Sequence, residues 1–187
     1  MATAWPRVRV NLLIDNWRGL RDRLLRDEVE LFVADIRDLE HDPLLFIEAL
    51  GTHPGVMFGR PGHPLENRKG LSMSDLLEYP LAATQLPEKV ELELNLISGR
   101  VQPVSIQCDN FMVLKALVAQ SNVISMAPWD VIANDVAAGR LVTLPLPLSS
   151  FNQNSAYGLV SRAGHSLSPA AQAMRLQILE DDPLASE

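Results

Sequence analysis

The 187-residue sequence is poor in cysteine, in aromatic residues and in positive charge. Its single cysteine, Cys108, excludes an internal disulfide framework and fits a reducing compartment. The net charge of −7 gives the chain no electrostatic attraction for a polyanion such as DNA. No apolar run is long enough to span a bilayer, and residues 1–10 lack the apolar core of a signal peptide. We therefore expect a cytoplasmic protein that contacts neither membrane nor DNA through this chain.

The sequence does have enough apolar surface to form a folded core. Hydrophobic residues make up 47% and charged residues 21%, which is far from the composition of disordered chains. The length fits one domain or two small lobes. Strand-like and helix-like patterns alternate along the chain, which predicts an α/β fold with mostly parallel sheets.

The predicted elements form two series of alternating strands and helices. Strands are predicted over 8–14, 31–34, 45–50, 55–58, 81–84, 101–107, 123–126, 141–146 and 157–161. Helices are predicted over 17–26, 73–78, 110–120, 128–138 and 169–180. We interpret the two series as two lobes joined by two crossovers, with a ligand cleft between them. The first lobe takes residues 1–58 and 147–187, and the second takes 59–146.

Several helices carry recognisable end residues. Asp15 or Asn16 is expected to cap the first helix, and Asp109 the helix that contains Phe111. Two further signals are the capping box of Ser72 with Asp75 and the Ser168-Pro169 pair before the last helix. Gly139 is expected to end the fourth predicted helix in a left-handed conformation.

The chemistry of the sequence does not favour an enzyme. The four histidines lack metal-ligand partners two to five residues away, and Cys108 has no neighbouring histidine. Sequence motifs for a serine nucleophile, a P-loop or a dinucleotide site are absent. We expect no catalytic residue, no metal and no cofactor. Histidines beside proline or glycine are interpreted as surface-turn residues, although His63 could face the cleft.

Polar residues at strand ends favour a binding protein instead. Asp35 and Gln85 follow predicted strands, and Asn110 opens a helix. In open α/β sheets, ligands bind where strands end and helices begin. Each of these residues could equally serve as an ordinary cap or turn residue. Their predicted convergence on one cleft is therefore the stronger argument.

Four segments, in this order and spacing, resemble the effector-binding domain of LysR-type transcriptional regulators. They are RPGHPL (60–65), LSMSDLLEYPL (71–81), GRLVTLPLP (139–147) and LSPAAQAM (167–174). The resemblance implies a two-lobed fold like type 2 periplasmic binding proteins, with a small effector in the cleft. It also implies that the family's winged helix-turn-helix and the first strand and helix of the first lobe are missing, so we expect an N-terminal truncation. DNA would be bound only through that absent module.

The resemblance assigns ligand-binding roles to Asp35, Arg60, Gln85, Asn110, Phe111 and Met126. Phe111 and Met126 could instead be core residues. The effector is expected to be a small organic acid or an amino-acid-like compound. A homodimer or homotetramer is also implied, with Leu20, Leu24 and Leu117 at the dimer interface or, alternatively, in the internal core.

The expected function is therefore effector sensing and oligomerisation within a LysR-family DNA-binding regulator. Two alternatives remain open at this stage. One is a stand-alone small-molecule-binding protein of the periplasmic-binding type. The other is an inactive truncated fragment.

Overall fold

The computed structural model describes residues 7–145 and 154–182, apart from the side chain of Met73. The chain divides into two compact units. Unit 1 contains residues 1–52 and 156–187, and unit 2 contains residues 53–155.

The division differs from the predicted lobe boundaries. Unit 2 begins at His53, ahead of the boundary expected after residue 58, and it ends at Ser155 rather than at residue 146. The first difference arises because strand β3 (Gly55–Gly59) pairs with two strands of unit 2. Its sequence identified it as a strand, but only its partners could assign it to a lobe.

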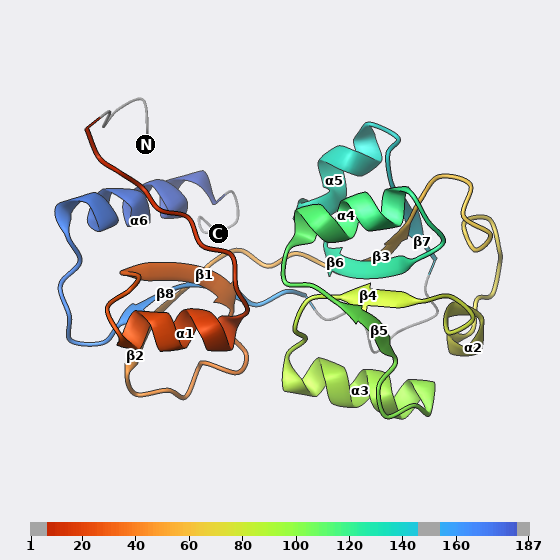
Figure 1. The fold of residues 1–187 in the computed structure, drawn as a ribbon, viewed down its shortest axis with the longest axis horizontal. Helices are drawn as coiled ribbons and strands as arrows, with labels where there is room; N and C mark the ends of the chain where they lie inside the picture. The colour runs from red at the N-terminus through yellow and green to blue at the C-terminus, as the bar shows by residue number, and fades with distance from the viewer. Residues whose placement is uncertain (1–6, 146–153, 183–187) are drawn as a thin grey trace. The chain divides into compact units, whose positions relative to one another are not determined.

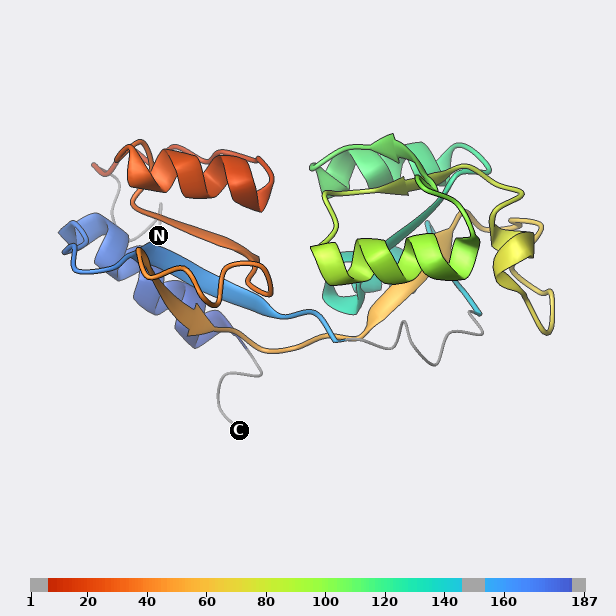
Figure 2. The ribbon, with the colours of Figure 1, turned by 90° about the horizontal axis from the view of Figure 1, so that it is seen from below.

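Unit 1 is a three-stranded antiparallel sheet between two helices. The strand order is β1 (Leu31–Asp35), β8 (Tyr157–Arg162) and β2 (Leu45–Ala49). Helices α1 (Trp17–Leu25) and α6 (Pro169–Asp181) lie on opposite faces of this sheet (Figures 1 and 2). The core under α1 is apolar and contains Leu20, Leu24, Phe32, Ala34, Ile36, Leu39, Leu45 and Val160.

Helix α1 forms where its capping residue and apolar spacing predict it. The Asn16 side chain accepts a 3.0 Å hydrogen bond from the backbone amide of Gly19, which satisfies one of the free amides of the first turn. Leu20 and Leu24, four residues apart, are 8% and 1% exposed and face the sheet. The sequence-based prediction of this helix is confirmed.

Residues 8–14 do not form the predicted strand. The described residues 8–16 contain neither helix nor strand, and the side chains of Leu12 and Ile14 are 84% and 67% exposed. A strand requires a neighbour for its backbone groups, and β1 pairs with β8 instead. The first predicted β-α-β unit is therefore not formed.

Unit 2 has a five-stranded mixed sheet. Its strand order is β5 (Val104–Gln107), β4 (Leu81–Ala83), β6 (Ile124–Pro128), β3 and β7 (Val142–Leu144). Strand β4 runs parallel to β5 and β6, whereas β3 is antiparallel to β6 and β7. The prediction of mostly parallel sheets is wrong, because every pairing in unit 1 and half of those in unit 2 are antiparallel in the described residues.

Helices cover both faces of the sheet in unit 2. Helix α3 (Glu88–Ser98) lies on one face, and α4 (Phe111–Ala119) and α5 (Trp129–Ala137) lie on the other (Figures 1 and 2). The short helix α2 (Met73–Leu76) begins at the predicted capping box, in which the Ser72 amide donates to Asp75 at 2.8 Å. Two apolar clusters fill the two faces, one including Leu94 of α3 and the other Leu114 of α4.

Helix α3 was not predicted, although the sequence contains a signal for it. Val90 and Leu94, four residues apart, are its buried residues. Gly99 follows with φ of 64°, the left-handed conformation that commonly ends a helix. Gly139, which was predicted to end a helix, has φ of 67° and follows α5 in the same way.

Candidate ligand-binding site

Two loops are joined at the edge of the unit 2 sheet where the parallel strands β4 and β5 end. The backbone amide of Gln85, after β4, donates a 2.8 Å hydrogen bond to Oδ1 of Asp109, after β5. Nε2 of Gln107 donates to Oε1 of Gln85, also at 2.8 Å. We call Gln85, Gln107 and Asp109 the amide cluster. Asp109 was expected to cap α4, but its carboxylate holds the neighbouring loop instead.

Asn110 performs the capping role at this edge. Its Oδ1 accepts hydrogen bonds from the backbone amides of Met112 at 2.9 Å and Val113 at 3.4 Å. A capping side chain fixes the loop that precedes the helix. The structure therefore brings two predicted ligand residues, Gln85 and Asn110, to one edge, on loops that Asp109 ties together.

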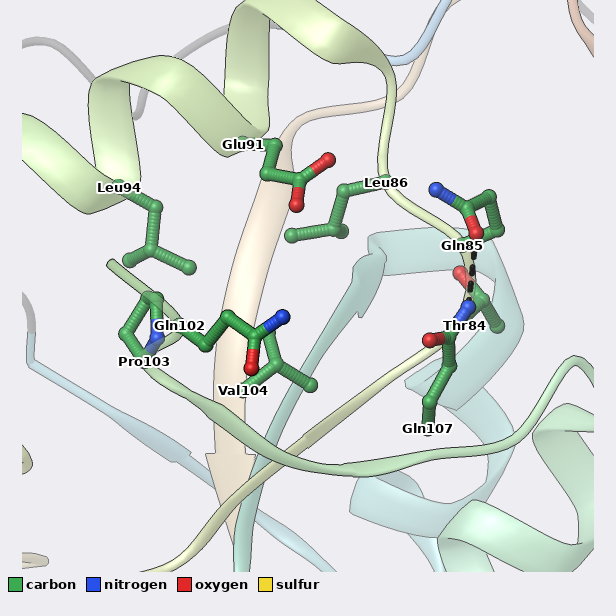
Figure 3. A pocket seen from close by; sticks show the side chains of 9 residues that line it. All are labelled: Thr84, Gln85, Leu86, Glu91, Leu94, Gln102, Pro103, Val104 and Gln107. Carbon is green, nitrogen blue, oxygen red and sulfur yellow. Dashed lines mark hydrogen bonds between the residues drawn. The ribbon is translucent and has the colours of Figure 1, made fainter. Parts of the chain in front are cut away.

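A pocket of about 170 Å³ adjoins the amide cluster, between α3 and strands β4 and β5. Thr84, Gln85 and Gln107 supply polar lining from the sheet edge (Figure 3). Leu86, Leu94 and Val104 supply apolar lining. The carboxylate of Glu91 extends from α3 toward this space, and the amide of Gln102 extends from the opposite side (Figure 3).

Sequence reasoning missed Glu91, Gln102 and Gln107. Gln107 ends the strand predicted over 101–107, so its position at a strand end was an available signal. Glu91 lies on a helix that was not predicted, and its approach to the sheet depends on how α3 packs.

Arg60 is not at this edge. Strand β3 is antiparallel to β6, and Phe58 pairs with Ser125 while Gly55 pairs with Pro128. The carboxyl end of β3 therefore lies beside the amino end of β6, opposite to the edge that carries Gln85. There the Arg60 guanidinium donates to Oδ1 of Asn122 at 3.0 Å.

Asp35 belongs to unit 1, and its carboxylate is already engaged. Nε of Arg37 donates to its Oδ1 at 2.9 Å, and the Arg37 backbone amide donates to the same oxygen at 3.1 Å. Hydrogen bonding to this carboxylate raises the pKa of Arg37. Asp35 therefore holds the turn after β1 through a local ion pair.

His63 is buried rather than a surface-turn residue. It is 3% exposed, and its ring packs edge-on against Tyr79 with 4.7 Å between ring centroids. Its Nδ1 accepts from the Leu65 amide at 3.2 Å, so Nε2 carries the proton and donates to the Asn122 carbonyl at 3.2 Å. Burial lowers the pKa of His63, which favours the neutral ring.

The remaining predicted residues are parts of the two cores. Phe111 and Met126 are half-buried and pack against the two clusters of unit 2. Leu20 and Leu24 are buried in the core of unit 1, which favours the core alternative, and their place at a dimer interface stays a prediction. Leu117 is half-buried and packs against the core of unit 2.

In the described part of the chain, no three His, Cys, Asp or Glu side chains form a group that could hold a metal ion. The described helices include none that is long and apolar enough to cross a membrane.

Comparison with known proteins identifies the family. Residues 1–182 match the family model described as the LysR substrate binding domain. The chain belongs to this family. The LysR domain is 55% identical over 183 residues to the SDS degradation transcriptional activation protein of Pseudomonas sp. (strain ATCC 19151). The aligned region covers 97% of this chain and 60% of that relative. The LysR domain therefore spans less than two thirds of the relative's length.

Solved structures confirm the fold of the LysR domain. It resembles the CcmR regulatory domain of Synechocystis PCC6803 in complex with 2-PG, with a TM-score of 0.70 and 17% identity, over 97% of this chain and 87% of that one. It also resembles the effector domain of the transcriptional regulator AmpR of Pseudomonas aeruginosa, with a TM-score of 0.65 and 17% identity. This match covers 96% of this chain and 83% of that one. The predicted periplasmic-binding-protein-like α/β fold is confirmed. The predicted membership of the LysR family is confirmed as well.

Proposed function

We propose that the complete regulator activates genes for the degradation of SDS or related alkyl sulfates, and that the LysR domain senses its effector. The support is the 55% identity to a relative whose name describes that role. We further propose that the regulator is cytoplasmic, acts as a homodimer or homotetramer, and binds DNA through a helix-turn-helix module outside residues 1–187. The domain senses its ligand without catalysing a reaction.

The effector site that we propose is the edge of unit 2 that carries Gln85 and Asn110. The observation that carries this proposal is the 2.8 Å hydrogen bond from Gln85 to Asp109, which joins two loops at strand ends. Ligands of open α/β sheets bind at such edges, and a ligand that contacts both loops would change their separation. The effector is a small organic acid or an amino-acid-like compound.

The test is a ligand screen on the full chain by two-dimensional NMR. We expect one compound of these two classes to shift the amide signals of Gln85, Asp109 and Asn110 in a saturable way. Gln85→Ala should weaken this binding, whereas Gln120→Ala should not, because Gln120 is exposed beyond the other end of α4. Binding that leaves these signals unchanged would place the effector elsewhere.

The transcriptional role requires its own test in cells. Deletion of the gene should abolish the induction of alkyl sulfate hydrolase transcripts by SDS, and restoring the gene should recover it. Unchanged induction in the deletion strain would remove the proposed link to SDS degradation without affecting the ligand site.

A further inference from the structure

The α3 pocket has a charge pattern that selects among ligand classes. Among the nine described residues that line it, Glu91 is the one with an acidic side chain, and none of the nine is basic. Within the described part of the chain, its carboxylate has neither a hydrogen bond nor an ion pair. A small anion in this pocket would face a carboxylate with no lining cation to offset it.

The other polar groups of the pocket can accept hydrogen bonds from a donor. Gln107 uses its NH₂ group toward Gln85, so its Oε1 is left as an acceptor. Gln102 presents a second amide from the opposite side of the pocket (Figure 3). An ammonium group has three donors and no acceptor, and it forms its strongest hydrogen bonds with a carboxylate.

The apolar lining limits the part of the ligand that lies beyond its head group. Leu86, Leu94 and Val104 flank the polar groups and are suited to a short hydrocarbon segment. The volume of about 170 Å³ restricts the bound part to a few carbon atoms beyond the head group.

We propose that the α3 pocket binds a primary ammonium group, with Glu91 as its counter-ion and a short hydrocarbon chain against Leu86, Leu94 and Val104. This inference rests on the proposed function, because it narrows the effector to the amino-acid-like class at the same sheet edge. The pocket would reject a small ligand whose only charged group is a carboxylate or a sulfate.

The experiment compares four ligands that share one hydrocarbon chain and differ in the head group. Butylammonium, 1-butanol, butanoate and butyl sulfate are titrated separately into the full chain, and the side-chain amide signals of Gln85, Gln102 and Gln107 are followed by NMR. We expect saturable shifts with butylammonium, and binding weakened by about two- to fivefold for the other three, because Glu91 is exposed and solvent screens its charge. Equal or tighter binding of any of the other three, or no saturable shift with butylammonium, would overturn the proposal.

A pair of variants tests whether Glu91 causes the preference for butylammonium. Glu91→Gln should weaken butylammonium binding by about two- to fivefold, because it removes an exposed counter-ion while keeping the shape of the side chain. Glu93→Gln makes the same charge change on α3 outside the pocket lining and should leave binding unchanged. Equal losses in both variants would show a nonspecific charge effect and overturn the assignment.

These results are independent of the effector screen. If that screen finds a ligand that shifts Gln85 and Asp109 while butylammonium fails, the ammonium inference falls and the proposed function stands. If butylammonium binds as predicted while SDS induction is unchanged in the deletion strain, the proposed link to SDS degradation falls and the pocket assignment stands.

Discussion

The Gln85 backbone amide donates to the Asp109 carboxylate at 2.8 Å, and this bond joins loops that are separated by 24 positions in the sequence. It holds together the strand ends beside which the pocket opens. The edge is therefore shaped by a side chain that was predicted to cap a helix. That helix is capped by Asn110.

Replacing Asp109 by alanine should destabilise the chain and loosen this edge. A hydrogen bond to a charged group contributes roughly 1.5–3 kcal/mol, so we expect a loss of about that size in the free energy of unfolding. Urea denaturation measures it, and the amide exchange rate of Gln85 should rise. Asp22→Ala is the control, because Asp22 is exposed on α1 and should change stability by less than about 0.5 kcal/mol. Equal losses in the two variants would contradict the role given to Asp109.

Leu24→Ala should be strongly destabilising because Leu24 is a core residue, 1% exposed. Truncating a buried leucine costs about 2–5 kcal/mol. Leu12→Ala, at a position 84% exposed, should cost less than about 0.5 kcal/mol. Chemical denaturation at two protein concentrations measures both. If Leu24→Ala instead changed only the self-association of a stable chain, the result would support the predicted dimer interface and contradict the core role.

Protonation of His63 should weaken the folded state. Burial lowers its pKa from the ordinary value of 6.5, so between 6.5 and the lowered value the unfolded chain binds a proton that the folded chain does not. The contribution of neutral His63 to the free energy of unfolding is therefore fully present above pH 6.5, and it is lost as the pH falls below 6.5. Unfolding free energies from pH 8 to pH 5 should show this decline.

The histidine variants identify the source of that decline. His63→Gln should flatten the part of the pH dependence that lies just below 6.5, whereas His41→Gln should retain it, because His41 is exposed. A decline of equal size in wild-type and His63→Gln chains would assign it to other groups.

Gly158→Ala should be destabilising because β8 has no room for a side chain at this position. An added Cβ would lie 2.6 Å from Cγ2 of Ile36 and 3.1 Å from the backbone oxygen of Glu48. Overpacking of this kind costs about 1–3 kcal/mol. Combining it with Ile36→Ala should cost less than the sum of the two single changes, since the clash with Ile36 is removed. Strict additivity in thermal or urea unfolding would contradict the clash.

The direction of the preceding strand decides at which edge of the sheet each predicted site residue lies. Gln85 and Asn110 lie at the same edge because β4 and β5 are parallel. Gln85 lies in the loop after β4, and Asn110 lies in the loop after β5. Arg60 also follows a strand, but β3 runs the opposite way and carries it to the other edge. Glu91 was missed because its place in the pocket depends on the packing of α3 against the sheet.

The sequence by itself determined the local features of this protein. Asn16, the Ser72–Asp75 pair and Gly139 act within a few residues of their own position, so their roles as helix ends could be recognised without the fold. Tertiary structure alone decided the direction of the strands, the unit to which β3 belongs and the unpaired state of residues 8–14. The physical reason is that a strand is completed by a partner from a distant part of the chain, whereas a helix satisfies most of its backbone hydrogen bonds within itself.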